Sequence, residues 1–187
     1  MDFGPETFLP SDSWRLTTKR HSIFVHPTQC LWTCDSLGPD LLGGTSVYDL
    51  AEDLALGRVD WDEVAAIEVV RAPTSWSPLG KYVVLDNKRF TAIVLASQYS
   101  KDLADRFIQV SLVRVRKDYL EEISTSTTEG SSVWMRDRES QKWGQIAHSW
   151  YDTEIRLKLP KHLPRLHHSD WIRKFMGPSV TPDTSVH

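Results

Sequence analysis

Four consecutive polar residues, Asp86-Asn87-Lys88-Arg89, lie between two apolar runs of the chain. The run from Tyr82 to Leu85 is typical of a buried strand, and the run from Phe90 has the apolar spacing of a helix. The N-terminus of a helix presents backbone N–H groups and a partial positive charge, so it favours an anion. Because Lys88 and Arg89 add two cations there, the tetrad 86–89 is a candidate phosphate site.

Each side chain of the tetrad has its own candidate role. Lys88 and Arg89 would neutralise phosphate oxygens, and Asn87 would hydrogen-bond a ribose or a phosphate. Asp86 would hold a metal cation or orient a water molecule during catalysis. A structural alternative uses the same residues, with Asp86 or Asn87 as the helix N-cap and both cations solvated.

A second candidate loop, Gly43-Gly44-Thr45-Ser46, precedes a further run with helical spacing, expected as a helix over 46–56. Its backbone and the hydroxyls of Thr45 and Ser46 would contact the same phosphates as the tetrad. The alternative is an ordinary loop in which Thr45 or Ser46 caps the helix.

Two further segments hold polar side chains next to an expected strand over 22–26. Thr33 and Ser36, in the segment 32–36, would line the same cleft as hydroxyl donors, or the segment packs as a buried turn. His26, at the end of the strand and before Pro27, is a candidate general base, or it closes the strand with a hydrogen bond.

The elements that must position these residues follow from the hydrophobic pattern. Strands are expected over 22–26, 66–71, 82–85, 108–115 and 133–136, and helices over 46–56, 90–99 and 139–157, with loops over 35–45 and 123–132. This order indicates an α/β (α+β) fold in which a small mixed sheet is flanked by helices.

A family resemblance rests on the strand 66–71 and on the tetrad with its flanks. The matching residues are Ile67, Val69 and Val70, then Tyr82-Val-Val-Leu-Asp-Asn-Lys-Arg-Phe90, Ala92 and Ala96. Over about half of the chain this order and these motifs resemble the ParB and sulfiredoxin superfamily. Compared with the family motif, Asn87 replaces a glycine and Lys88 replaces an arginine. The turn holds no cysteine, which argues against sulfiredoxin chemistry.

The resemblance implies a ParB-like nucleotide-binding protein that acts on phosphate groups, either an NTP hydrolase or a nuclease. It implies a nucleotide or nucleic acid as partner and Mg²⁺ with a nucleoside triphosphate as cofactor, with Asp86 as the candidate metal ligand. Two alternatives stay open. One is a catalytically silent protein-interaction module, and the other is a toxin or effector built on the same fold.

Length and composition limit the remaining classes. The 187 residues suit one domain with tails: a lead-in over 1–20, a ParB-like core over 21–120, a helical C-terminal extension over 121–176 and a disordered tail over 177–187. A net charge of -3 argues against a surface that coats nucleic acid.

The sequence also predicts the environment and partners of the chain. No run approaches the length of a membrane span, and Cys30 and Cys34 fit reduced thiols better than a disulfide framework. We expect a soluble intracellular protein, cytoplasmic or nuclear. Its tryptophan-rich C-terminal region is a candidate surface for a homodimer or a protein partner.

Overall fold

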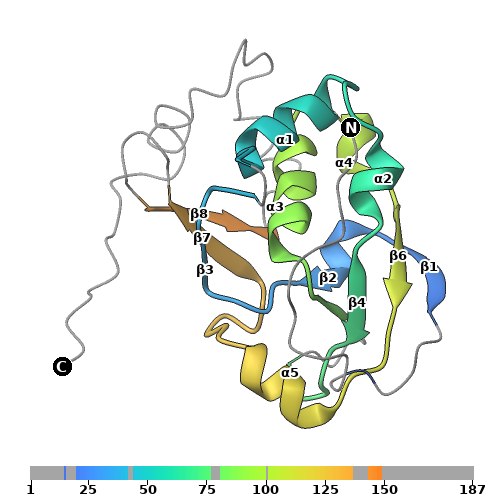
Figure 1. Cartoon of the computed structure of the whole chain (residues 1–187), viewed down its shortest axis with the longest axis vertical. Helices are drawn as coiled ribbons and strands as arrows, with labels where there is room; N and C mark the ends of the chain where they lie inside the picture. Colours follow the sequence, from blue (N-terminus) through green and yellow to red (C-terminus); the bar gives the residue numbers. More distant parts are fainter. Residues whose placement is uncertain are drawn as a thin grey trace.

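The fold combines helices with two small sheets (Figure 1). The computed structural model describes residue 15 and residues 20–41, 44–76, 81–99, 101–136 and 143–148. Within these residues no helix has both the length and the apolar character needed to cross a bilayer. The helices and the two sheets together make a mixed α/β fold, as the hydrophobic pattern predicts.

The larger sheet has five strands in the order β1-β6-β4-β5-β2. Pairs β4–β6 and β2–β5 are parallel, whereas β1–β6 and β4–β5 are antiparallel. Strands lie in the four ranges expected for this part of the chain, and the two-residue β2 was not expected. The bounds are β1 His21–Val25, β2 Cys30–Leu31, β4 Glu68–Arg71, β5 Tyr82–Val84 and β6 Ile108–Leu112.

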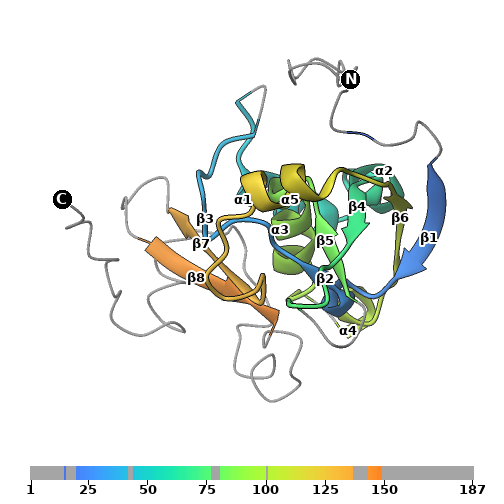
Figure 2. The same ribbon diagram turned by 90° about the horizontal axis from the view of Figure 1, so that it is seen from below.

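Helix α3 (Asn87–Ala96) is the buried centre of the molecule, because every residue from Phe90 to Ala96 is buried. Helix α1 (Val47–Ala55) packs on it (Figures 1 and 2). The remaining helices are α2 Trp61–Ala65, α4 Lys101–Ala104 and α5 Lys117–Ile123. The expected helix 90–99 is misplaced at its start, because the cap at Asp86 brings three tetrad residues into the first turn.

The smaller sheet has the order β3-β7-β8 and lies on the side away from β1 (Figure 2). Its strands are β3 Ser36–Leu37, β7 Ser132–Arg136 and β8 Trp143–Ala147. The helix expected over 139–157 is wrong at β8, where Gly144 and Ile146 are buried and their neighbours are only partly buried. That alternation has a period of two, which is the period of a strand. Residues 139–142 and 149–157 of the expected helix lie outside the described residues, as does the tail expected over 177–187.

The expected loops 35–45 and 123–132 are also corrected in part. Strand β3 interrupts the first loop and pairs in parallel with β7, at the other end of the described chain. The second loop is polar but not wholly exposed. Its Gly130 is buried and accepts a hydrogen bond from the Trp32 N–H at 3.0 Å, and Thr125 N–H donates to the Thr33 carbonyl at 2.8 Å. This loop therefore holds the segment that contacts the tetrad.

Candidate functional site

The tetrad lies at the start of α3, and Asp86 is the N-cap of that helix. One Asp86 carboxylate oxygen accepts from the Arg89 N–H at 3.1 Å, and the other lies 3.3 Å from Nε of Arg89. The capping alternative is confirmed for Asp86. Its carboxylate remains 40% exposed and within reach of a ligand.

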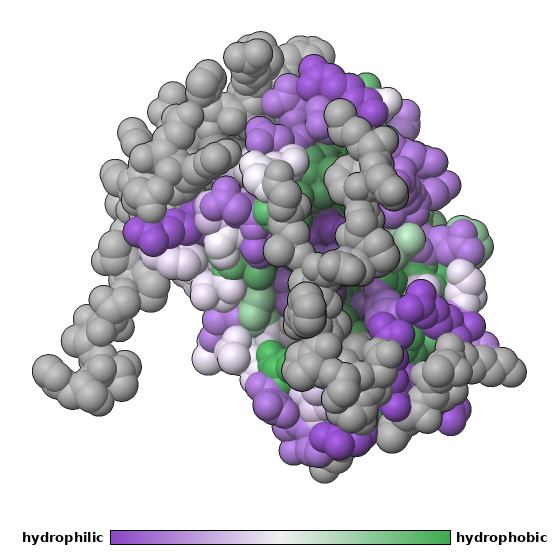
Figure 3. Space-filling view, viewed as in Figure 1, coloured by the Kyte–Doolittle hydropathy of each residue, from purple (hydrophilic) through white to green (hydrophobic). Residues whose placement is uncertain are grey.

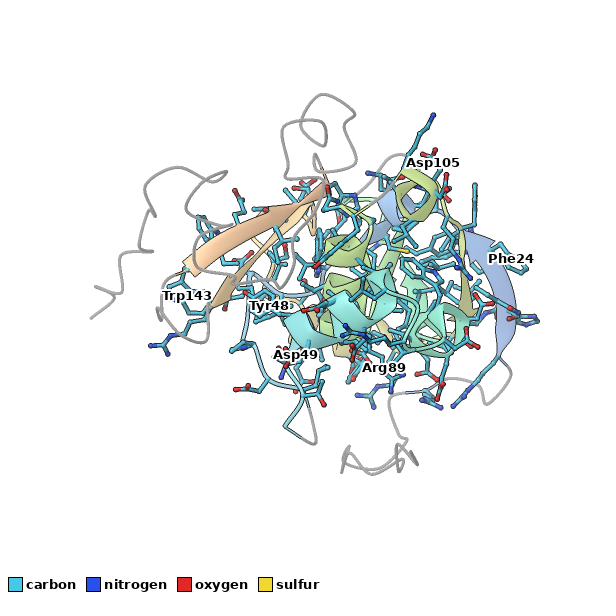
Figure 4. All side chains as sticks on the ribbon, turned by 90° about the horizontal axis from the view of Figure 1, so that it is seen from above. Phe24, Tyr48, Asp49, Arg89, Asp105 and Trp143 are labelled. Atoms are coloured by element: carbon cyan, nitrogen blue, oxygen red, sulfur yellow. The ribbon has the colours of Figure 1, made fainter. Side chains whose placement is uncertain are left out.

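Lys88 and Arg89 place two cations around this helix end. Arg89 is 43% exposed, and Figure 4 shows it on the same side of the molecule as Asp49 of α1. The Lys88 ammonium donates to the main-chain carbonyl of Asp40. Among the described residues, no hydrogen bond uses the backbone N–H groups of Asn87 and Lys88. Two N–H groups without a hydrogen bond among the described residues therefore lie at a helix end that also carries two cations, an arrangement that suits an anion.

Asn87 joins α3 to the segment that follows β2. Its Oδ1 accepts from the Thr33 N–H at 2.9 Å, and its Nδ2 donates to the Thr33 hydroxyl. Thr33 is only 3% exposed, so this backbone donor would have no partner in water if the amide were removed. The side chain of Asn87 is thus fully engaged in a structural clamp.

A buried tryptophan reinforces the same junction. The indole N–H of Trp32 donates to the Thr91 hydroxyl at 2.9 Å, and that hydroxyl donates to the Asn87 carbonyl at 2.7 Å. The Trp32 ring also lies 4.9 Å from the Phe90 ring, centroid to centroid. The first turn of α3 is therefore held rigidly, and its cations project from a fixed backbone.

The second candidate loop is brought close to the tetrad through Asp40. Asp40 pairs with Ser46 across a tight hairpin, in which Leu41 N–H donates to the Thr45 carbonyl at 2.8 Å. The ammonium of Lys88 contacts the base of this hairpin. No residue type indicates this contact, because the acceptor is a backbone carbonyl, which any residue carries.

Within that hairpin the candidate residues differ in availability. Gly44 and Thr45 are exposed, with Gly44 at φ +85°. Ser46 is 3% exposed, and its hydroxyl accepts from the Asp49 N–H at 3.0 Å as the N-cap of α1. The capping alternative is therefore confirmed for Ser46, which leaves Thr45 as the accessible hydroxyl. Gly43 lies outside the described residues.

Ser36 and His26 make no hydrogen bond to the tetrad among the described residues. Ser36 is exposed on β3, opposite Trp134 of β7. His26 follows β1, with Nε2 2.9 Å from the Ala104 carbonyl and Nδ1 2.8 Å from the Thr28 hydroxyl. Because Ala104 belongs to α4, which follows the far end of α3, His26 lies away from the tetrad. Its ring closes the end of the strand, as the structural alternative predicts.

The two cysteines are free thiols. Burial raises the pKa of Cys30 to about 12, and burial together with the charge of Asp35 raises the pKa of Cys34 to about 11. A raised pKa keeps the thiol protonated and unreactive near neutral pH. This environment does not suit a redox pair.

We therefore predict that neither Cys30 nor Cys34 reacts appreciably with an aromatic disulfide reagent at pH 8 while the protein is folded. Both should react once the chain is unfolded in guanidinium, which exposes the thiols and removes the burial that raises their pKa values. The measurement is the absorbance of the released thiolate with and without denaturant. Rapid reaction of one thiol in the folded protein would contradict the prediction.

The site thus consists of a rigid helix end with two cations, two unused N–H groups and a half-exposed carboxylate, beside an exposed hydroxyl. Comparison of this chain with protein-family models, with curated proteins and with solved structures finds no match.

Proposed function

We propose that the chain binds the phosphate groups of a nucleotide or a nucleic acid at the N-terminus of α3, on a ParB-like fold. The observation that carries the proposal is the hydrogen bond from Lys88 to the Asp40 carbonyl, because Asp40 pairs with Ser46 of the second candidate loop. The order β1, α1, β4, β5, α3, β6, with the tetrad at the N-terminus of α3 directly after β5, supports the proposed ParB-like fold.

In this proposal Lys88 and Arg89 pair with phosphate oxygens, and the N–H groups of Asn87 and Lys88 donate to the same group. Arg89 leaves Asp86 when the phosphate arrives, because the more highly charged anion competes for the guanidinium. The backbone cap from Asp86 to the Arg89 N–H is unaffected by this exchange.

Hydrolysis of a triphosphate or a phosphodiester would use Mg²⁺. Among the described residues no group of three or more His, Cys, Asp or Glu side chains gathers as a metal site. We infer that Asp86, once released by Arg89, would be the protein residue that holds Mg²⁺ bound to the phosphates, and that the ion would supply charge neutralisation there.

Isothermal titration calorimetry with CTP, ATP, GTP and short DNA, with and without magnesium, tests this function. We expect Lys88→Ala and Arg89→Ala each to weaken binding about tenfold or more, since a charge-assisted hydrogen bond contributes more than about 1.4 kcal/mol. Circular dichroism should show both variants folded.

Arg71→Ala is the matched control. Arg71 is an exposed cation opposite Tyr82, at the end of β5 away from Asp86. Its removal changes the net charge equally but should leave the affinity unchanged. The proposal fails if no ligand binds, or if Arg71→Ala weakens binding as much as Arg89→Ala does.

A catalytically silent interaction module is the second candidate, and one observation favours it. Asn87, Ser46 and His26 all direct their side chains to hydrogen bonds within the fold. Ligand binding without turnover of bound CTP, ATP, GTP or DNA in magnesium would support this candidate over the enzyme.

A further inference from the structure

Strand β1 is an edge strand without charged side chains. Among the described residues β1 pairs with β6 alone, and Figures 1 and 2 show it at the margin of the molecule. Its sequence, His-Ser-Ile-Phe-Val, has no Lys, Glu, Asp or Pro within the strand. Natural edge strands often carry such residues to block pairing with another chain. This edge is therefore open to a further strand.

This edge strand carries a large exposed apolar side chain, that of Phe24. Phe24 is 70% exposed, and Figure 4 shows it pointing outward from β1. Phe107 precedes β6 and is 57% exposed. The direct partner of Phe24 on β6 is Gln109. Phe107 is two positions before Gln109, so it lies on the same face of the sheet as Phe24. Figure 3 shows apolar surface near the right-hand margin, where β1 and β6 lie.

We propose that β1 pairs with β1 of a second copy of this chain, antiparallel, about a two-fold axis at Phe24. This register sets Phe24 opposite its own copy and Ile23 opposite Val25 of the second copy. A strand without charged side chains is complementary to itself, because no like charges oppose each other. The two five-stranded sheets join into a continuous one, and the most exposed aromatic side chain among the described residues of each copy is covered.

The faces of the sheet limit the register to two-fold axes that pass through a residue, and the axis at Phe24 is the one that sets the exposed Phe24 side chains opposite each other. In an antiparallel pair, residues directly opposite each other lie on the same face, so an outward residue must meet an outward residue. The two-fold at Phe24 meets this condition and also covers Ile23, which is only partly buried within one copy. This surface is separate from the phosphate site, so the inference does not depend on the proposed function.

Sedimentation velocity of the full chain over a range of concentrations tests the inference. We expect wild type to show a monomer–dimer equilibrium, and Phe24→Lys or Phe24→Glu to raise the dissociation constant about tenfold or more, because like charges then face each other. An equimolar mixture of the two variants should restore the dimer, since Lys then faces Glu.

Leu56→Lys is the control, because Leu56 is also a large exposed apolar residue, 53% exposed, but lies at the C-terminus of α1. This variant should dimerise as wild type does. The inference is overturned if wild type is a monomer at all concentrations. Phe24 would then be covered by another segment of the same chain or by a different partner. It is also overturned if the dimer persists in Phe24→Glu, or if mixing the two variants restores nothing.

Discussion

Replacing Gly130 with alanine is expected to lower the free energy of unfolding by about 3 to 5 kcal/mol, because conformational strain and overpacking add together. Gly130 has φ +73°, a region that side chains with a Cβ rarely adopt. An added Cβ would lie 2.5 Å from the Trp32 carbonyl oxygen and 2.7 Å from Cβ of Leu31. Both neighbours belong to or follow β2, so neither can move without disturbing the sheet.

The effect should extend to the candidate site. Gly130 accepts the Trp32 N–H, and Trp32 and Thr33 together hold the first turn of α3 through Thr91 and Asn87. A displaced loop would therefore loosen the backbone that presents Lys88 and Arg89. Urea denaturation followed by tryptophan fluorescence measures the stability, and phosphate-ligand affinity measures the loosening.

Gly57→Ala separates strain from packing. Gly57 also has a positive φ, +66°, but an added Cβ would meet nothing within 4 Å. This variant should therefore lose only the conformational contribution, about 1 to 2 kcal/mol. Equal losses for Gly57→Ala and Gly130→Ala would show that the contact with Trp32 does not matter.

Strands β1, β4, β5 and β6 of the larger sheet and helices α1 and α3 could be predicted because their signals are local, whereas the short β2 and helix α5 were not expected. The apolar run at Tyr82–Val84 and the helical spacing of α1 belong to single segments, as does the capping side chain of Asp86. Thr33 was expected to line the cleft as a hydroxyl donor, and it does lie against Asn87 of the tetrad. It is buried, however, and its hydroxyl accepts from Asn87, which fits the alternative of a buried turn.

Of the smaller sheet, β7 lies where a strand was expected over 133–136, but β3, β8 and the loop before β7 could not be predicted, because their signals are long-range. Trp143 and Ile146 have a spacing that also fits a helix, and only pairing with β7 makes the segment a strand. Gly130 is buried in a polar loop because Trp32, about a hundred residues earlier, lies against it. The Lys88–Asp40 contact likewise uses a backbone carbonyl that no residue type reveals.

Acid should destabilise this protein through His148, which follows β8 and packs, partly buried, beside Trp32 and Phe90. The His148 ring is 5.1 Å from the Trp32 ring and 6.4 Å from the Phe90 ring, and its buried Nε2 has no hydrogen-bond partner among the described residues. Burial, with a smaller contribution from the charge of Lys81, lowers the pKa of His148 from 6.5 to about 4. The folded state therefore holds this imidazole neutral.

The direction of the pH effect follows from proton binding. Between pH 6.5 and pH 4 the unfolded chain protonates His148 and the folded chain does not, so stability falls as the pH falls through this window. The full loss is on the order of 3 kcal/mol, from about 1.4 kcal/mol for each pKa unit. Above pH 6.5 the group makes no pH-dependent contribution, and below pH 4 the loss is complete.

His148→Gln isolates this contribution, because glutamine retains a polar side chain and does not titrate. Urea denaturation of wild type and of His148→Gln at pH 7.5, 6.0 and 4.5 gives the free energy of unfolding of each at each pH. The difference between the two proteins cancels the carboxylates and the other histidines, whose effects both proteins share. At pH 7.5 the variant should be the less stable protein, because it loses packing against Trp32. That deficit should shrink toward pH 4.5, where wild type must keep a neutral imidazole against its tendency to bind a proton. A deficit that stays constant over the three pH values would mean that His148 does not control acid stability.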